Sequence, residues 1–155
     1  MSKKPEIDDI DLQILNILTQ NAKKPYSEVA KKVYVSGGTV HVRMKKMEDL
    51  GLVQGATLEL DYSKLGYDIS AFIGIYLEKS AMYDTVIAEL KGIREITNLH
   101  YTTGNYSIFA KLYCKDTKHL KDILYDKIQK ISGISRTDTM ISLEESLNRN
   151  ISFSK

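Results

Sequence analysis

The residues best suited to bind a partner lie along residues 37–50, whose apolar spacing predicts a helix. At 100° per residue, four residues fall on one side of this helix and form its predicted buried stripe: Val40, Met44, Met47 and Leu50. The opposite side carries a glycine, a histidine, a valine and two lysines: Gly38, His41, Val42, Lys45 and Lys46. Glycine allows close approach to a phosphate backbone, lysine neutralises phosphates, histidine can donate to base acceptors, and valine can touch a thymine methyl. This face is therefore predicted to enter the major groove of double-stranded DNA.

The charge distribution supports a DNA-binding face, although the net charge of +2 does not. Residues 23–46 carry seven basic residues against one acid, a local charge of +6, whereas residues 6–11 carry four acids and no base. A lysine pair alone is more often a solvated helix face. A DNA-binding interpretation is favoured instead by the neighbouring Lys31 and Lys32 and by the adjacent Gly37 and Gly38. Arg43 lies beside the buried stripe, where it either pairs with an acid or reaches a phosphate.

The sequence offers no arrangement typical of an enzyme. His41, His100 and His119 fall on different predicted elements without metal-ligand spacing, and there is no glycine-rich dinucleotide or phosphate-binding motif. Cys114, the single cysteine, is predicted to be a buried small hydrophobe. We therefore expect no catalytic residues, no metal and no cofactor.

Three predicted helices position the DNA-binding face. The first, residues 10–21, is amphipathic and capped by Asp8 or Asp9, and the second spans residues 26–33 after Pro25. Ser36 is a natural N-cap for the third helix, and Gly51 suits its left-handed end. A tight turn between the second and third helices makes this a helix-turn-helix. Residues 52–60 are expected to form a wing and an outgoing strand, so that residues 1–60 form a winged helix-turn-helix domain.

The rest of the chain predicts an α/β sandwich. After a linker, residues 61–67, the expected elements are strand 69–77, helix 82–91, strands 96–102 and 106–114, helix 118–131 and strand 134–143. A shift of 38 positions aligns the apolar residues of the two halves. The βαββαβ order and this repeat predict a ferredoxin-like domain, residues 68–155, and an α+β chain as a whole. Its helix-free sheet face would carry Phe72, Tyr76 and Phe109, so we expect a partner subunit to cover it.

Three ordered motifs show a family resemblance across residues 7–143. They are Ile7-Asp8-Asp9-Ile10-Asp11-Leu12-Gln13-Ile14-Leu15, Ser36-Gly37-Gly38-Thr39-Val40-His41-Val42-Arg43 and Leu65-Gly66-Tyr67. On these motifs the chain resembles the Lrp/AsnC family of feast/famine regulators. His41-Val42-Arg43 and residues 101–109 are more similar to the asparagine-responsive AsnC branch than to the leucine-responsive branch. Two positions depart from the family: Pro25 replaces a frequent serine cap, and Tyr34 replaces a small or apolar turn residue.

The resemblance implies a bacterial transcription regulator that contacts DNA through the third helix. Its DNA-contacting residues would be Ser36, Gly38, Thr39, His41, Val42, Arg43, Lys45 and Lys46. The sandwich would form a dimer, commonly assembled as an octamer of four dimers, with an amino-acid effector bound between dimers.

The resemblance places much of the effector pocket in the loop between the second and third strands of the sandwich. The implied effector residues are Tyr101, Thr102, Thr103, Gly104, Tyr106 and Ser107, together with Gln129 from a neighbouring subunit. Gly104 can present its N–H to a carboxylate, and the hydroxyls can bind an amino or amide group. Many family members carry Asp where this chain has Ser107, so a neutral amide-bearing ligand is favoured, with asparagine first. By itself the loop would be interpreted as a simple hairpin turn.

The resulting hypothesis is a sequence-specific DNA-binding regulator whose assembly or operator affinity responds to a small amino acid. The alternative is an amino-acid sensor or assembly module with little specific DNA binding, which a gel shift against genomic fragments distinguishes. No apolar run reaches the roughly 20 residues of a membrane helix, and the first residues do not resemble a secretory signal. We therefore expect no membrane partner and a cytoplasmic location.

Overall fold

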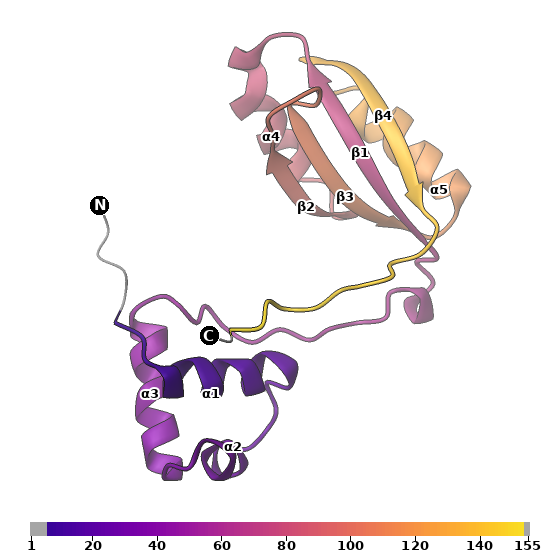
Figure 1. Cartoon of the computed structure of the whole chain (residues 1–155). Coiled ribbons are helices and arrows are strands. Elements are labelled where there is room, and N and C mark those ends of the chain that lie inside the picture. Colours follow the sequence, from indigo (N-terminus) through magenta and orange to yellow (C-terminus); the bar gives the residue numbers. More distant parts are fainter. Residues whose placement is uncertain (1–5, 154–155) are drawn as a thin grey trace. The chain divides into compact units, whose positions relative to one another are not determined.

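The computed structural model describes residues 6–153, which divide into two compact units (Figure 1). One unit contains the described residues up to Glu59 together with those from Leu147 onward, and the other spans Leu60–Ser146. The sequence predicted that residues 147–153 belong to the sandwich domain, but in the structure they pack with the N-terminal helices. No helix in residues 6–153 is long and apolar enough to cross a membrane.

The first unit contains the three expected helices, α1 (Asp9–Gln20), α2 (Tyr26–Val33) and α3 (Gly37–Asp49). Asp8 caps α1 in a reciprocal arrangement: its Oδ1 accepts from the Asp11 N–H at 2.9 Å, and its own N–H donates to Asp11 Oδ2 at 3.2 Å. Ser36 caps α3 by accepting from the Thr39 N–H at 3.1 Å. Gly51 follows α3 with φ 70°, the left-handed conformation expected of it.

The helices pack through the apolar stripes that their spacing predicts. The core of this unit consists of residues from all three helices: Ile14, Leu15, Leu18, Val29, Ala30, Val33, Val40, Met44 and Met47. Because Val40, Met44 and Met47 all point into this core, the opposite side of α3 is left to the surface. The prediction that Leu50 belongs to the buried stripe is wrong: it is the C-cap of α3, where the helix ends, and it is 49% exposed.

The segment after α3 is extended and forms no strand in the part of the chain that the structure describes. The N–H groups of Leu52 and Val53 both donate to the Met47 carbonyl, at 2.9 and 3.1 Å, and Gly55 has φ 151°. The outgoing strand expected over residues 52–60 is therefore not formed, because no second strand pairs with it here.

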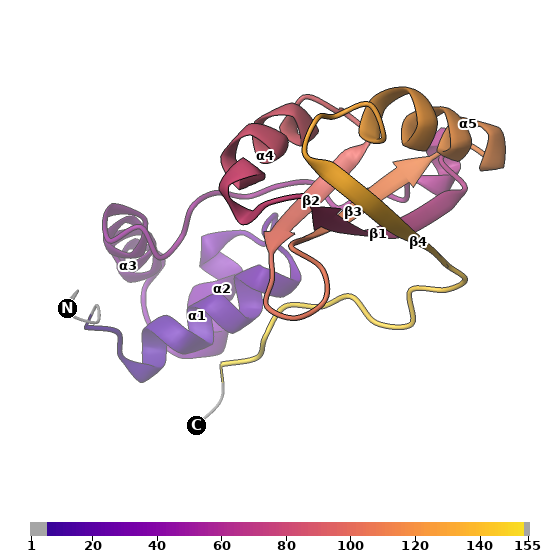
Figure 2. The same ribbon diagram turned by 90° about the horizontal axis from the view of Figure 1, so that it is seen from above.

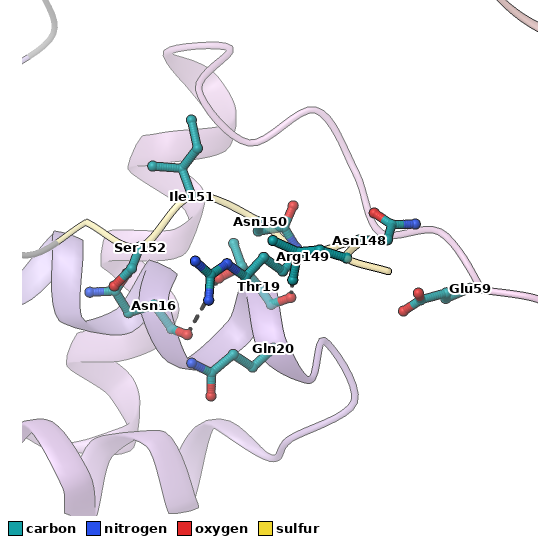
Figure 3. Close-up of a pocket in the computed structure, with 10 residues that line it drawn as sticks. Asn16, Thr19, Gln20, Glu59, Asn148, Arg149, Asn150, Ile151 and Ser152 are labelled. Carbon is teal, nitrogen blue, oxygen red and sulfur yellow. Dashed lines mark hydrogen bonds between the residues drawn. The ribbon is translucent and has the colours of Figure 1, made fainter. Parts of the chain in front are cut away.

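The C-terminal segment packs against α1 (Figure 3). The Asn16 amide makes two hydrogen bonds with the backbone of Phe153: Nδ2 donates to the carbonyl at 2.8 Å, and Oδ1 accepts from the N–H at 2.7 Å. Asn150 Nδ2 donates to the Thr19 carbonyl at 2.9 Å. The segment and α1 line a pocket of about 850 Å³. Sequence reasoning did not anticipate this contact.

The second unit has the expected βαββαβ order. Its elements are β1 (Ile69–Leu77), α4 (Tyr83–Lys91), β2 (Ile96–Tyr101), β3 (Ile108–Cys114), α5 (Thr117–Asp122) and β4 (Ile134–Ser142). The antiparallel sheet has strand order β2-β3-β1-β4, and α4 and α5 lie on one side of it (Figure 2). The ferredoxin-like fold is confirmed.

The second helix of the sandwich departs from the expected continuous helix over residues 118–131. After α5 the chain widens into a π-helix, Ile123–Ile128, and the Gln129 N–H donates five residues back to the Leu124 carbonyl at 2.8 Å. The widened turn buries both Ile123 and Ile128, which lie five residues apart and would be separated by about 140° on an α-helix.

The carboxylate of Glu95 is buried beside the side chains of Lys127, Arg94 and His119. Lys127 Nζ lies 2.9 Å from both carboxylate oxygens, and His119 Nε2 lies 3.4 Å from one of them. Burial raises the pKa of Glu95, but the hydrogen bonds from Lys127, the Glu95 backbone and Arg94 outweigh it and lower the pKa to about 2. Cys114 is buried as predicted, and burial raises the pKa of its thiol to about 11.

The helix-free face of the sheet carries a cluster of half-buried aromatic rings. Phe72 and Phe109 stack at 5.6 Å between ring centroids, and Tyr106 meets Tyr76 edge-on at 5.2 Å. Tyr106 crosses directly over Gly74, where any Cβ atom would overlap its ring. The rings therefore shield one another in the single chain while leaving apolar surface on this face.

Candidate DNA-reading helix and effector loop

The outer face of α3 presents the predicted DNA-contacting side chains to the surface. His41 is exposed, Val42 is 71% exposed, and the Lys45 side chain is 72% exposed. Lys45 Nζ lies 3.4 Å from Asp49 on the same helix. Because this ion pair is exposed to solvent and weak, a DNA phosphate can take the place of Asp49 as the partner of Lys45. Val42, which is exposed between His41 and Lys45, contributes little to the packing of this unit.

The N-terminus of α3 is open to an anion. The Ser36 hydroxyl engages both the N–H and the hydroxyl of Thr39, and a Cβ atom at Gly38 would meet no atom closer than Ser36 Oγ at 3.8 Å. Ser36, Gly38, Thr39 and Val42 help line a surface pocket of about 640 Å³. The first-turn N–H groups and the helix dipole make such a surface favourable for phosphate.

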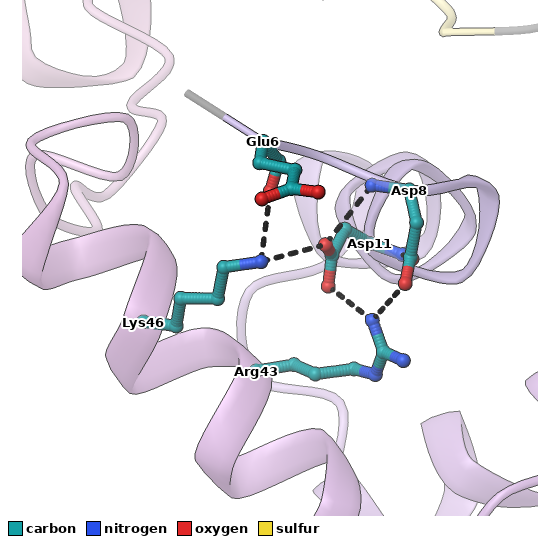
Figure 4. Close-up of polar contacts among 5 residues, drawn as sticks. All are labelled: Glu6, Asp8, Asp11, Arg43 and Lys46. Atoms are coloured by element: carbon teal, nitrogen blue, oxygen red, sulfur yellow. Dashed lines mark hydrogen bonds and ion pairs between the residues drawn. The ribbon is translucent and has the colours of Figure 1, made fainter.

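Arg43 and Lys46 are held in a polar network between α3 and the start of α1 (Figure 4). Arg43 Nη1 lies 2.7 Å from Asp8 and 2.8 Å from Asp11, whose side chain is fully buried. Lys46 Nζ donates to the Glu6 carbonyl at 2.8 Å and lies 3.8 Å from Asp11. Of the two alternatives for Arg43, the free chain thus adopts the acid pair.

The network shifts the proton equilibria of its members. Hydrogen bonds to Asp11 and then Asp8 raise the pKa of Arg43. The Asp11 N–H, followed by Arg43, lowers the pKa of Asp8. Sequence reasoning missed the part played by Asp11, although the acid-rich segment 6–11 and the basic segment 23–46 were a signal that the two attract each other.

The loop after β2 is a compact turn closed by its own hydrogen bonds. Thr102 Oγ1 donates to the Tyr106 carbonyl at 2.7 Å, and the Thr102 N–H donates to the Ser107 carbonyl at 3.2 Å. The Ser107 N–H donates across to Ile75 of β1 at 2.9 Å. Gly104 has φ 100° and Thr103 is exposed, so the tip of the loop presents backbone and hydroxyl groups outward.

The other predicted effector residues present their side chains on other surfaces of the sandwich. Tyr101 is 64% exposed and packs against Tyr83 at 4.3 Å between ring centroids. The Tyr106 ring lies on the helix-free sheet face. Gln129 is exposed at the end of the π-helix.

Comparison with known proteins assigns both units. Residues 70–151 match the model of the Lrp/AsnC ligand binding domain, and residues 7–54 match a winged helix-turn-helix DNA-binding domain. The chain belongs to the Lrp/AsnC family. It is 43% identical over 145 residues to the regulatory protein AsnC of Haemophilus influenzae, covering 94% of this chain and 97% of that protein. The Escherichia coli K12 protein of the same name is 42% identical, covering 94% of this chain and 95% of that protein.

Solved structures of the Lrp/AsnC fold agree with this assignment. The structure of E. coli AsnC matches with a TM-score of 0.90 and 41% identity, over 95% of this chain and 99% of that one. A Neisseria meningitidis regulator in complex with L-methionine matches with a TM-score of 0.90, over 96% of this chain and 97% of that one, but at 19% identity shows the fold alone. This Lrp/AsnC chain is a DNA-binding transcription regulator with a ligand-binding domain, and its family consists of regulators rather than enzymes.

Proposed function

We propose that this regulator reads operator DNA with the outer face of α3 and senses a small polar amino acid, asparagine first, at the loop of residues 102–107. The effector changes either the assembly or its operator affinity. The observation that carries this proposal is the division of α3, which buries Val40, Met44 and Met47 while leaving Val42 and Lys45 more than two-thirds exposed.

The proposed DNA contacts divide into base-reading and backbone contacts. His41 and Val42 reach base edges, while Ser36, Gly38, Thr39, Lys45 and Lys46 lie where they can approach phosphates. Arg43 acts mainly by holding α3 against α1, and it reaches a phosphate only by exchanging one of its carboxylate partners. Lys46 is half-exposed, so its ammonium can turn from the Glu6 carbonyl to DNA.

Substitutions on α3 test this division on a duplex selected by the full-length protein. Lys45→Ala should weaken binding to all sequences and lower the salt slope by about one, because one phosphate contact is lost. His41→Ala should relax preference at one base pair at a cost of about 1–3 kcal/mol. Unchanged binding by both variants would remove this face from the interface.

The proposed effector site is supported by the chemistry of the loop. An amino acid needs donors for its carboxylate and acceptors for its ammonium, and residues 102–107 offer N–H, carbonyl and hydroxyl groups around Gly104. Ser107 adds no fixed charge, which favours a neutral amide-bearing side chain over a ligand bound through an acid. The complex of the Neisseria relative with L-methionine supports an amino acid as the ligand class. Gln129 would complete the site from a neighbouring subunit.

Calorimetry with the twenty amino acids tests this assignment. Asparagine should bind, and Thr103→Val should weaken binding because the variant keeps the shape of threonine but lacks its hydroxyl. Thr85→Val, an exposed position on α4, is the matched control and should bind normally. Heat from other amino acids but not asparagine would overturn the ligand, while equal binding by both variants would remove Thr103 from the site.

The assembly we propose is a dimer closed over the helix-free sheet face, with octamers of four dimers as the larger form. The aromatic cluster around Phe72 and Phe109 supplies apolar surface for such an interface. We place the regulator in the cytoplasm, because reading an operator requires access to the chromosome. Light scattering should show even-numbered assemblies, and a stable monomer at micromolar concentration would contradict them.

A further inference from the structure

The turn of the helix-turn-helix contains a strained aromatic residue. Tyr34, the C-cap of α2, has φ 57° and ψ 43°, and it is the only non-glycine residue with positive φ among residues 6–153. Its N–H and that of Val35 both bond to the Ala30 carbonyl, so the left-handed conformation closes the helix end. Glycine normally occupies such a position. A side chain with a Cβ atom there disfavours the folded state by a factor of about 5 to 30.

Among residues 6–153, packing of the Tyr34 ring does not offset this strain. Tyr34 is 94% exposed, more than any other aromatic residue that the structure describes, so its ring gains almost no packing. The left-handed conformation closes the end of α2, but a glycine would do so without strain, and the exposed ring adds no packing to the fold. Residues kept in such conformations cluster at functional surfaces, so the outlier points to a partner that the ring meets.

The surroundings of Tyr34 identify this partner as DNA. It lies two residues before Ser36, the N-cap of α3, and directly follows a helix turn that carries the exposed Lys31 and Lys32. In helix-turn-helix docking, the first residues of the recognition helix enter the major groove while the preceding helix crosses the backbone. The turn that joins them therefore follows the rim of the groove, where phosphates are exposed.

We propose that Tyr34 is an additional DNA contact, whose phenolic O–H donates to a phosphate at the rim of the major groove. Tyrosine hydroxyls are among the groups that bind phosphate oxygens in protein–DNA complexes, and their contacts fix register without reading sequence. The ring extends this hydroxyl beyond the turn, which a glycine or a small residue could not do. The inference rests on DNA reading by α3, and its test must separate the two.

The neutrality of the phenol gives the contact a distinctive signature. Tyr34→Phe removes one hydrogen bond and should weaken operator binding about 3- to 10-fold. The loss should be equal across operator variants, because the contact is to the backbone. The salt slope should stay unchanged, because no cation and no released counterion is lost, whereas Lys45→Ala lowers the slope by about one.

Two further variants separate the ring from the backbone strain. Tyr34→Ala keeps the strained Cβ atom but removes the ring, and Tyr34→Gly removes both. Both variants should weaken DNA binding at least as much as Tyr34→Phe. The helical unit should be more stable in Tyr34→Gly than in Tyr34→Ala, because glycine removes the strained Cβ atom. Tyr125→Phe, at a 65% exposed tyrosine of the π-helix, is the matched control and should leave DNA binding unchanged.

The experiment measures fluorescence anisotropy of a labelled duplex, selected from a random library by the full-length wild type, at several salt concentrations. The proposal is supported by a weaker complex with an unchanged slope for Tyr34→Phe. Wild-type affinity for Tyr34→Phe alongside weakened binding by Lys45→Ala overturns the Tyr34 contact alone. A changed slope, or a loss confined to one operator position, also overturns it. If the wild type selects no duplex, both this contact and DNA reading by α3 are wrong.

Discussion

Replacing Arg43 with methionine should loosen the helical unit more than any exposed substitution on α3. Methionine preserves much of the aliphatic length but leaves the buried Asp11 carboxylate with Lys46 at 3.8 Å as its nearest cation. Removing one partner of a buried ion pair costs about 3–5 kcal/mol. Because Arg43 is 23% exposed and Lys46 partly compensates, we expect the lower end, about 3 kcal/mol.

The assay is hydrogen exchange of the full chain, resolved by peptide mass spectrometry. Peptides from α1 and α3 should exchange about two orders of magnitude faster in Arg43→Met, because opening becomes easier by about 3 kcal/mol. Peptides from β1 and β3 serve as the internal reference, since the network lies in the other unit. Lys45→Ala, which breaks only an exposed pair, should leave protection in α3 nearly unchanged.

A double-mutant cycle identifies the cause of the loosening. Asp11→Asn in the Arg43→Met background removes the stranded charge, so the double variant should be more stable than the sum of the single losses by at least about 1 kcal/mol. Additive effects would show that Arg43 stabilises α3 by packing alone. Unchanged α1 and α3 protection in Arg43→Met would refute the role of the network altogether.

Three further changes test the rest of the structure. The folded-state pKa of Glu95, about 2, lies below its ordinary value of 4.5, so its stabilisation is complete above pH 4.5 and disappears as pH falls toward 2. Glu95→Gln should therefore destabilise the sandwich by about 3 kcal/mol at neutral pH, with a deficit in denaturant titrations that shrinks in acid. Asn16→Ala removes both hydrogen bonds to Phe153, so C-terminal peptides should exchange and be cleaved by protease faster while α3 peptides are unaffected. Gly74→Ala should lower thermal stability by about 1–3 kcal/mol, because Tyr106 must leave the sheet; an unchanged melting temperature would mean that the ring moves freely.

Local periodicity and capping chemistry were enough to predict most elements. The cap of α3 at Ser36 and the bounds of β1 follow from residues close together in sequence, and the structure agrees with both. The predicted stripe of α3 is buried except at Leu50, which lies where the helix ends. The βαββαβ order also followed, because each element contributes its own apolar pattern. These features depend on period and turn chemistry, which a single sequence displays directly.

Features that depend on distant partners could not be predicted in the same way. Asp11 occupies a first-turn position where an acid suits the helix dipole, and its complete burial depends on distant partners, chiefly Arg43, 32 residues away, with Lys46 nearby. Asn16 meets Phe153 across 137 residues, and no local pattern marks either as a contact. The strain at Tyr34 was visible only as a departure from the family pattern, because a backbone angle cannot be derived from residue types alone.

The connectivity of the sandwich provides a path from the proposed effector loop to the helical unit. Residues 60–68 join the helical unit to the start of β1, and residues 143–146 lead from the end of β4 to the segment bonded to Asn16. Both connections leave one end of the sheet, since Ser70 of β1 pairs with Ser142 of β4. The loop of residues 102–107 lies at the other end of β1, where Ser107 donates to Ile75. Strand β1 is thus common to both regions, and an effector that binds two arrangements of this strand differently can bias both chain connections to the helical unit.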